Sequence, residues 1–123
     1  MTRVFVYGSL LRGEPNHRLL GDAHFIGLAR TRPAFALHDL GAFPGAVSHG
    51  TTAITGEIYE VDGPTLERLD RLEGHPHLYR REVVELVASD EPEFAYIYVY
   101  RASLAHARAI PSGDWREHKE RAR

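Results

Sequence analysis

The apolar residues of this chain fall into short runs rich in β-branched and aromatic side chains, and glycine or proline closes most of these runs. This pattern is typical of β-strands and turns. A chain built this way folds around a sheet, with few long helices. The expected strands cover residues 4–7, 25–37, 53–61, 81–88 and 94–100. The second of these forms one long strand or two shorter ones, interrupted near Pro33.

Two segments predict helices. Residues 15–20 favour a short helix that Gly21 closes. Residues 64–72 predict a longer one, because leucine recurs there at helical spacing and Asp62 is a suitable N-cap.

The helices do not alternate regularly with the strands, which argues against a doubly wound sheet. We therefore expect an α+β fold, a small mixed β-barrel or strongly curved sheet with flanking short helices. A chain of 123 residues fits one domain, expected to cover residues 1–113. Residues 114–123 are highly charged and predict a loosely held tail, and residues 38–52, with several glycines, predict a surface loop.

The composition of the chain limits the classes of function that it can have. The formal charge of −2 disfavours nucleic acid as a partner. No segment has the run of about 20 apolar residues that spans a membrane, and the apolar run after Met1 is too short for a signal peptide. A cytoplasmic protein is the expectation. Because the chain has no cysteine, disulfides and thiol chemistry are excluded.

The first candidate site is the turn Tyr7-Gly8-Ser9-Leu10, which follows the first strand. Such a turn either reverses the chain and does nothing more, or presents free backbone N–H groups to an anion or oxyanion. A phosphate loop is disfavoured, because Glu14 stands where that motif needs lysine. Ser9 lacks the second glycine of a nucleophile elbow, which weakens the case for a serine hydrolase.

The second candidate is Glu73, at the end of the helix expected over residues 64–72. A carboxylate there faces the negative end of the helix dipole, and burial would raise its proton affinity further. It is either a general base or an ordinary solvated glutamate. His75 and His77 lie nearby, but their spacing matches no established zinc pattern, and we predict no metal site.

Taken together, the stretches Y-G-S-L-L-R-G-E-P-N-H-R and L-E-G-x-P-x-L-Y-x-R resemble the γ-glutamylcyclotransferase-like family. The likeness is greatest to its γ-glutamylamine cyclotransferase branch and the plant avirulence-induced relatives. It extends from Val4 to about Val87, with a weaker echo in residues 110–115.

The resemblance implies a small mixed β-barrel that releases an amine and 5-oxoproline from a small γ-glutamyl substrate. It implies that Glu73 is the acid/base residue, that backbone groups of the Tyr7-Gly8-Ser9-Leu10 turn hold the substrate, and that Tyr79 lies beside it. Because ring closure is intramolecular, we expect no cofactor.

Two alternatives stay open: a binding module without catalysis on the same fold, and a hydrolase dependent on Ser9. The leaving amine is not encoded in any recognisable motif, although residues 38–52 are the expected selectors. The sequence indicates no particular oligomeric state.

Overall fold

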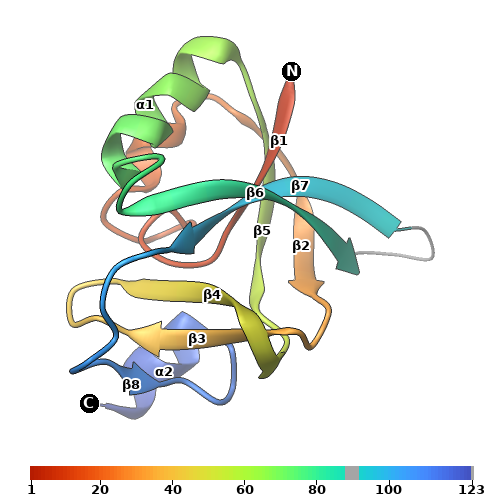
Figure 1. Cartoon of the computed structure of the whole chain (residues 1–123). Helices are drawn as coiled ribbons and strands as arrows, with labels where there is room; N and C mark the ends of the chain where they lie inside the picture. The colour runs from red at the N-terminus through yellow and green to blue at the C-terminus, as the bar shows by residue number, and fades with distance from the viewer. Residues whose placement is uncertain (88–91, 123) are drawn as a thin grey trace.

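The computed structural model describes residues 1–87 and 92–122 and contains eight strands, one 3₁₀ helix and two α-helices (Figure 1). In chain order they are β1 (Thr2–Val6), η1 (His17–Leu20), β2 (His24–Thr31), β3 (Phe35–Asp39), β4 (Pro44–Thr52), β5 (Thr55–Val61), α1 (Gly63–Glu73), β6 (Tyr79–Val87), β7 (Pro92–Tyr100), β8 (Arg108–Ala109) and α2 (Trp115–Arg121).

Five of the strands close into a barrel. The sheet order is β1-β5-β2-β6-β7-β4-β3-β8, and an additional parallel pairing joins β1 to β7. This pairing brings Val4 beside Tyr96 and Phe5 beside Ile97. The remaining strands, β4, β3 and β8, extend the sheet from β7 at one end of the molecule (Figure 1). The α+β class and the small mixed barrel are therefore confirmed.

The last three residues of β1, Val4–Val6, are buried on both faces, which explains their unbroken apolar sequence. Phe5 packs into one core cluster, inside the barrel, together with Trp115 of α2. Val4 and Val6 point the other way, into a second cluster that includes Leu69 of α1. The chain leaves β1 at the boundary of these two clusters, where the candidate turn begins.

The expected strands and the longer helix are confirmed with small shifts in their ends. The segment 25–37 forms two strands, β2 and β3, with Pro33 between them. In β5, a Cβ on Gly56 would lie 2.2 Å from the carbonyl oxygen of Val6, so glycine permits the close approach of β1. The last residue of the strand expected over residues 81–88 lies outside the described residues.

The prediction of a surface loop over residues 38–52 is wrong, because most of this segment forms β4 and the end of β3. Two of its glycines, Gly45 and Gly50, serve close packing within the sheet. A Cβ on Gly45 would lie 2.9 Å from Tyr100, and one on Gly50 would lie 2.4 Å from the carbonyl oxygen of Phe35. Only residues 40–43 form a connecting turn.

Residues 114–121 do not form a loosely held tail. Asp114 caps α2 by accepting a hydrogen bond from the amide of Glu117, and Trp115 is buried in the core. Charged residues of α2 reach back to the barrel, and His118 contacts Asp39 of β3 at 2.8 Å. Arg116, His118 and Lys119 thus have partners elsewhere in the fold, whereas Arg121 pairs with Glu117 of its own helix.

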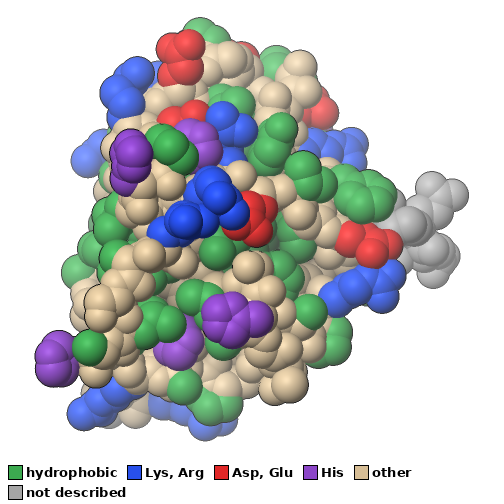
Figure 2. All heavy atoms as spheres, viewed as in Figure 1, with side chains coloured by type: hydrophobic (Ala, Val, Ile, Leu, Met, Phe, Trp, Pro, Cys, Tyr) green, Lys and Arg blue, Asp and Glu red, His purple; other side chains and the backbone are tan. Residues whose placement is uncertain are grey.

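Among the described residues, the helices are all too short or too polar to span a membrane. On the face shown in Figure 2, basic and acidic side chains are interspersed. The exclusion of nucleic acid as a partner stays a prediction from charge.

Candidate active site

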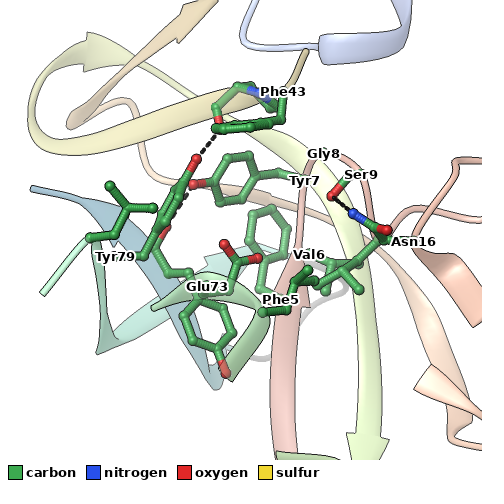
Figure 3. A pocket seen from close by; sticks show the side chains of 14 residues that line it. Phe5, Val6, Tyr7, Gly8, Ser9, Asn16, Phe43, Glu73 and Tyr79 are labelled. Carbon is green, nitrogen blue, oxygen red and sulfur yellow. Dashed lines mark hydrogen bonds between the residues drawn. The ribbon is translucent and has the colours of Figure 1, made fainter. Parts of the chain in front are cut away.

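A cavity of about 130 Å³ opens between the end of β1, the end of α1 and the start of β4. Every residue singled out from the two sequence motifs lines it: Tyr7, Gly8, Ser9, Leu10, Glu73 and Tyr79. In Figure 3 the Glu73 side chain points into this cavity, with Tyr7 and Tyr79 nearby. The fold thus brings together two motifs that lie more than sixty positions apart in the sequence.

The turn after β1 keeps its carbonyl groups occupied and its amides free. The carbonyl of Gly8 accepts from the amide of Leu11 at 3.1 Å, and that of Ser9 accepts from the amide of Asn16 at 2.9 Å. Within the described part of the chain, the amides of Gly8, Ser9 and Leu10 have no protein acceptor. Three consecutive free donors suit an anion or a developing oxyanion.

Gly8 is required here for space. A Cβ at this position would lie 2.6 Å from Cγ of Pro44, and the residue does not have a positive φ. The turn and the start of β4 therefore pack with no room for a side chain between them. Pro44 itself forms part of the cavity wall.

The two candidate tyrosines shape the wall through their hydroxyl groups. Tyr7 Oη donates to the carbonyl of Tyr98 at 2.6 Å and accepts from the amide of Ala46 at 3.1 Å. Tyr79 Oη donates to the carbonyl of Pro44 at 2.8 Å. Both rings therefore face the cavity while their hydroxyls tie strands together, which favours a positioning role over proton transfer.

Glu73 is the last residue of α1, and the chain turns sharply after it. Gly74 takes the left-handed conformation, with φ of 65°, and its amide donates to the carbonyl of Arg71. The amide of His75 donates to the carbonyl of Asp70 at 2.9 Å, which completes a Schellman-type end. This termination places Glu73 at the cavity.

The turn that follows is fixed by a network around Asp70. Arg81 donates to both carboxylate oxygens of Asp70, at 2.7 and 3.0 Å, and Tyr98 Oη donates to one of them at 2.7 Å. The amide of Arg81 also donates to Nδ1 of His75 at 3.1 Å. His75 is thus occupied in holding the backbone, and the described residues contain no cluster of metal-ligating side chains.

Burial raises the pKa of Glu73 to about 7. Within the described residues, its carboxylate has neither a hydrogen-bond donor nor an ion-pair partner to offset this burial. Its negative charge contributes to raising the pKa values of Tyr7 and Tyr79, although burial is the larger cause for both. A carboxylate with a pKa near neutrality is suited to exchange protons with a ligand.

Ser9 has no base beside it. The one side chain that hydrogen-bonds Ser9 Oγ in the described part of the chain is Asn16, whose Nδ2 donates at 3.1 Å (Figure 3). An amide cannot take the proton of a serine nucleophile. The arrangement therefore gives no support to the Ser9-dependent hydrolase.

Some cavity residues were not among the candidates. Asn16 and Leu78 lie inside the two quoted motifs, so the motifs themselves held a signal for them. Phe43 belongs to the segment expected to border the site and does line the cavity. Tyr98 reaches the cavity from the middle of β7, and nothing in its local sequence distinguishes it from other strand residues.

A second group of charged residues braces the turn from the opposite side. Glu57 of β5 accepts hydrogen bonds from the amide of Arg12 at 2.9 Å and from Arg116 of α2 at 3.0 Å. Arg116 also donates to the carbonyl of Arg12 at 2.6 Å, and Lys119 is paired with Glu14. These contacts, called the α2 brace below, hold residues 12–14 against the barrel.

Comparison with known proteins agrees with this geometry. The family described as "Gamma-glutamyl cyclotransferase, AIG2-like" matches residues 4–117. The chain belongs to this family. Its match includes both motifs and the first residues of α2, so Glu57 and Arg116 of the brace lie within the matched residues and Lys119 lies beyond them.

Relatives and solved structures share this assignment. A Vibrio cholerae protein provisionally named as a γ-glutamylcyclotransferase is 44% identical over 112 residues, covering 91% of this chain and 93% of its own length. The γ-glutamylcyclotransferase family protein YtfP of Escherichia coli is 34% identical, covering 92% and 95%. The crystal structure of an AIG2-like protein from Mus musculus has a TM-score of 0.80 and 30% identity, covering 93% of this chain and 88% of that chain.

Proposed function

We propose that this protein is a γ-glutamylamine cyclotransferase, which releases an amine and 5-oxoproline from a small γ-glutamyl substrate. The observation that carries the proposal is the unpaired Glu73 carboxylate in the same cavity as three free backbone donors. Relatives named for γ-glutamylcyclotransferase activity support the same reaction class.

The chemical problem is the protonated α-amino group of the substrate, because an ammonium has no lone pair to attack with. Moving its proton from a pKa of about 8 to an ordinary glutamate of about 4.3 costs about 5 kcal/mol. With the pKa of Glu73 near 7, the cost falls to about 1.4 kcal/mol. The burial of Glu73 thus removes most of this obstacle.

The reaction then proceeds within one molecule. Glu73 takes a proton from the α-ammonium, and the amine nitrogen attacks the γ-carbonyl carbon to close a five-membered ring. The carbonyl oxygen gains negative charge, which the amides of residues 8–10 can stabilise. Glu73 delivers its proton to the departing nitrogen as the old C–N bond breaks. The ring nitrogen gives up its remaining extra proton to the released amine, leaving 5-oxoproline and the protonated amine.

The free amides can serve the substrate's α-carboxylate as well as the oxyanion, because the cavity-lining residues in the described chain include no lysine, arginine or histidine. Anchoring by backbone donors and exclusion of water fold the substrate toward the attacking geometry. Such positioning adds to the roughly 10²–10⁴-fold that acid/base catalysis supplies.

The test is formation of 5-oxoproline over a panel of γ-glutamyl compounds by the purified chain and by Glu73→Gln. The variant should keep the fold and bind substrate, but its turnover should fall at least ~10²-fold. Glu67→Gln is the matched control, since Glu67 is an exposed residue of the same helix and undergoes the same chemical change. Near-normal turnover in Glu73→Gln would contradict the assigned role.

A binding module without catalysis would use the same cavity. Calorimetric titration with a γ-glutamylamine separates the two functions. Binding by the wild-type chain with no release of amine would favour the module and overturn the enzyme proposal.

A further inference from the structure

Three apolar side chains stand partly exposed where the cavity opens. Phe43, Leu72 and Leu78 line the cavity and are 40%, 38% and 40% exposed. Side chains of this kind are usually buried when they can be. We call these three residues the apolar rim.

The rim is held in place by its backbone. The carbonyl of Phe43 accepts from the amide of Leu40 at 3.0 Å, which closes the turn between β3 and β4. The amide of Leu78 donates to the carbonyl of Gly74, and its carbonyl accepts from the amide of Arg101, both at 2.9 Å. Leu72 belongs to the last turn of α1. The rim is therefore a preformed surface on both sides of the opening.

The cavity is too small for a whole substrate of any length. Its volume of about 130 Å³ lies below the roughly 300–1,000 Å³ typical of sites that enclose a drug-sized molecule. The glutamyl end must reach Glu73 and the free amides of the turn, so the group on the leaving nitrogen extends outward. It then meets the rim.

We propose that the apolar rim makes this chain select γ-glutamyl amides whose leaving amine carries an uncharged, apolar chain, and disfavour those with a second charged group. This inference rests on the proposed function. Glu73 is the only charged side chain among the fourteen residues that line the cavity, and the proton transfers occupy its carboxylate. A distal ammonium would lose water against the rim without gaining a partner.

The experiment compares γ-glutamyl-n-pentylamide with γ-glutamyl-5-aminopentylamide, which differ by one terminal ammonium in place of hydrogen. For the wild-type chain we expect kcat/KM to be at least ~10-fold higher for the pentylamide. Each methylene moved out of water improves binding about fourfold, and the terminal ammonium of the other amide opposes this burial because it finds no partner at the rim. In Phe43→Ala and Leu78→Ala the preference should fall to less than about threefold, mainly through loss of pentylamide turnover.

Leu28→Ala is the matched control, because Leu28 is 68% exposed and does not line this cavity. It should retain the wild-type preference. Equal turnover of the two amides, a preference for the charged one, or a preference that the rim variants leave intact would overturn the inference while leaving the proposed function standing.

If no γ-glutamyl compound yields 5-oxoproline, the proposed function fails, and calorimetry with the same two amides still tests the rim. Tighter binding of the pentylamide that is weakened in Leu78→Ala would support it. Equal affinities would overturn it.

Discussion

Glu57 is buried and Glu73 is half-buried in the cavity, yet their pKa values shift in opposite directions. Burial alone would raise the pKa of Glu57, which is only 4% exposed. Hydrogen bonds from the Arg12 amide, the Tyr59 hydroxyl and Arg116 outweigh that burial and hold its pKa below the ordinary value. Among the residues that the structure describes, Glu73 has no such donors, and burial raises its pKa to about 7.

The number of hydrogen-bond donors around a carboxylate therefore distinguishes a structural role, as for Glu57, from an acid/base role, as proposed for Glu73. A fully hydrogen-bonded carboxylate holds its charge and fixes its neighbours. A dehydrated carboxylate without donors has a proton affinity near that of a substrate amine, and its oxygens are free to bind one. Burial by itself does not distinguish the two.

The largest expected effect is on the pH dependence of turnover. Glu73 must be ionised to act as a base, so kcat/KM should fall about tenfold per pH unit well below pH 7, or about 50-fold between pH 7 and pH 5. Initial rates of 5-oxoproline formation across this range give the profile. An inflection near pH 4.5 would show that Glu73 titrates like an ordinary glutamate. The contrast between the pKa shifts of Glu73 and Glu57 would then be wrong.

Glu73→Gln should stabilise the fold at neutral pH. The pKa of Glu73 is higher in the folded chain than the ordinary 4.5, so the wild type loses stability as pH rises from about 4.5 to 7. The variant escapes this loss and should gain about 2 kcal/mol above pH 7, after allowance for partial exposure.

Urea unfolding at pH 4 and pH 7.5 measures this gain, with Glu67→Gln as the control. The two variants and the wild type should converge at pH 4. A destabilised Glu73→Gln at pH 7.5 would mean that the charge is compensated in the folded protein.

Glu57→Gln should show the opposite sign. Because the folded-state pKa of Glu57 is lowered, its ionised form stabilises the fold above its ordinary pKa, and that contribution disappears as pH falls through the folded value. The variant should lose about 1–2 kcal/mol at pH 7.5, with a smaller difference in acid. Thermal unfolding at several pH values tests this, and equal stability at pH 7.5 would contradict it.

The smallest effect concerns the α2 brace. Arg116→Met keeps much of the side-chain volume but removes the donors to Glu57 and to the Arg12 carbonyl. Because Arg116 is 38% exposed, we expect a loss of about 1 kcal/mol or less. Hydrogen exchange of amides in residues 11–16 should accelerate, whereas exchange in α1 should not. Unchanged protection of the amides in residues 11–16 would show that Arg116 does not hold this segment against the barrel.

Local patterns were sufficient for β1 and α1, since strand and helix periodicity there agree with the tertiary environment. Local patterns gave wrong predictions where a glycine or a charged residue is compatible with two different environments. Gly45 and Gly50 suggested a loop, but in β4 they allow neighbouring groups to approach closely. The charges of α2 suggested solvent, but residues such as Arg116 and Lys119 contact partners 59 to 105 positions earlier in the chain.

The candidate site was predictable in part for the same reason. Gly8 and Glu73 stand out locally because each interrupts a regular pattern at the end of an element. Tyr98 and Phe43 reach the cavity through barrel closure and strand pairing, which are not visible in any short segment. The resemblance joined the two motifs, and the closed barrel supplies the physical reason for their meeting.

The α2 brace also has a consequence for the order of events during synthesis. The Arg116 contact with the carbonyl of Arg12 spans 104 positions of sequence. The segment after Gly8 therefore leaves the ribosome well before its clamp in α2, which is synthesised about a hundred residues later. A chain without α2 would hold both motifs and still lack the contacts that fix residues 12–14 of the first motif against the barrel.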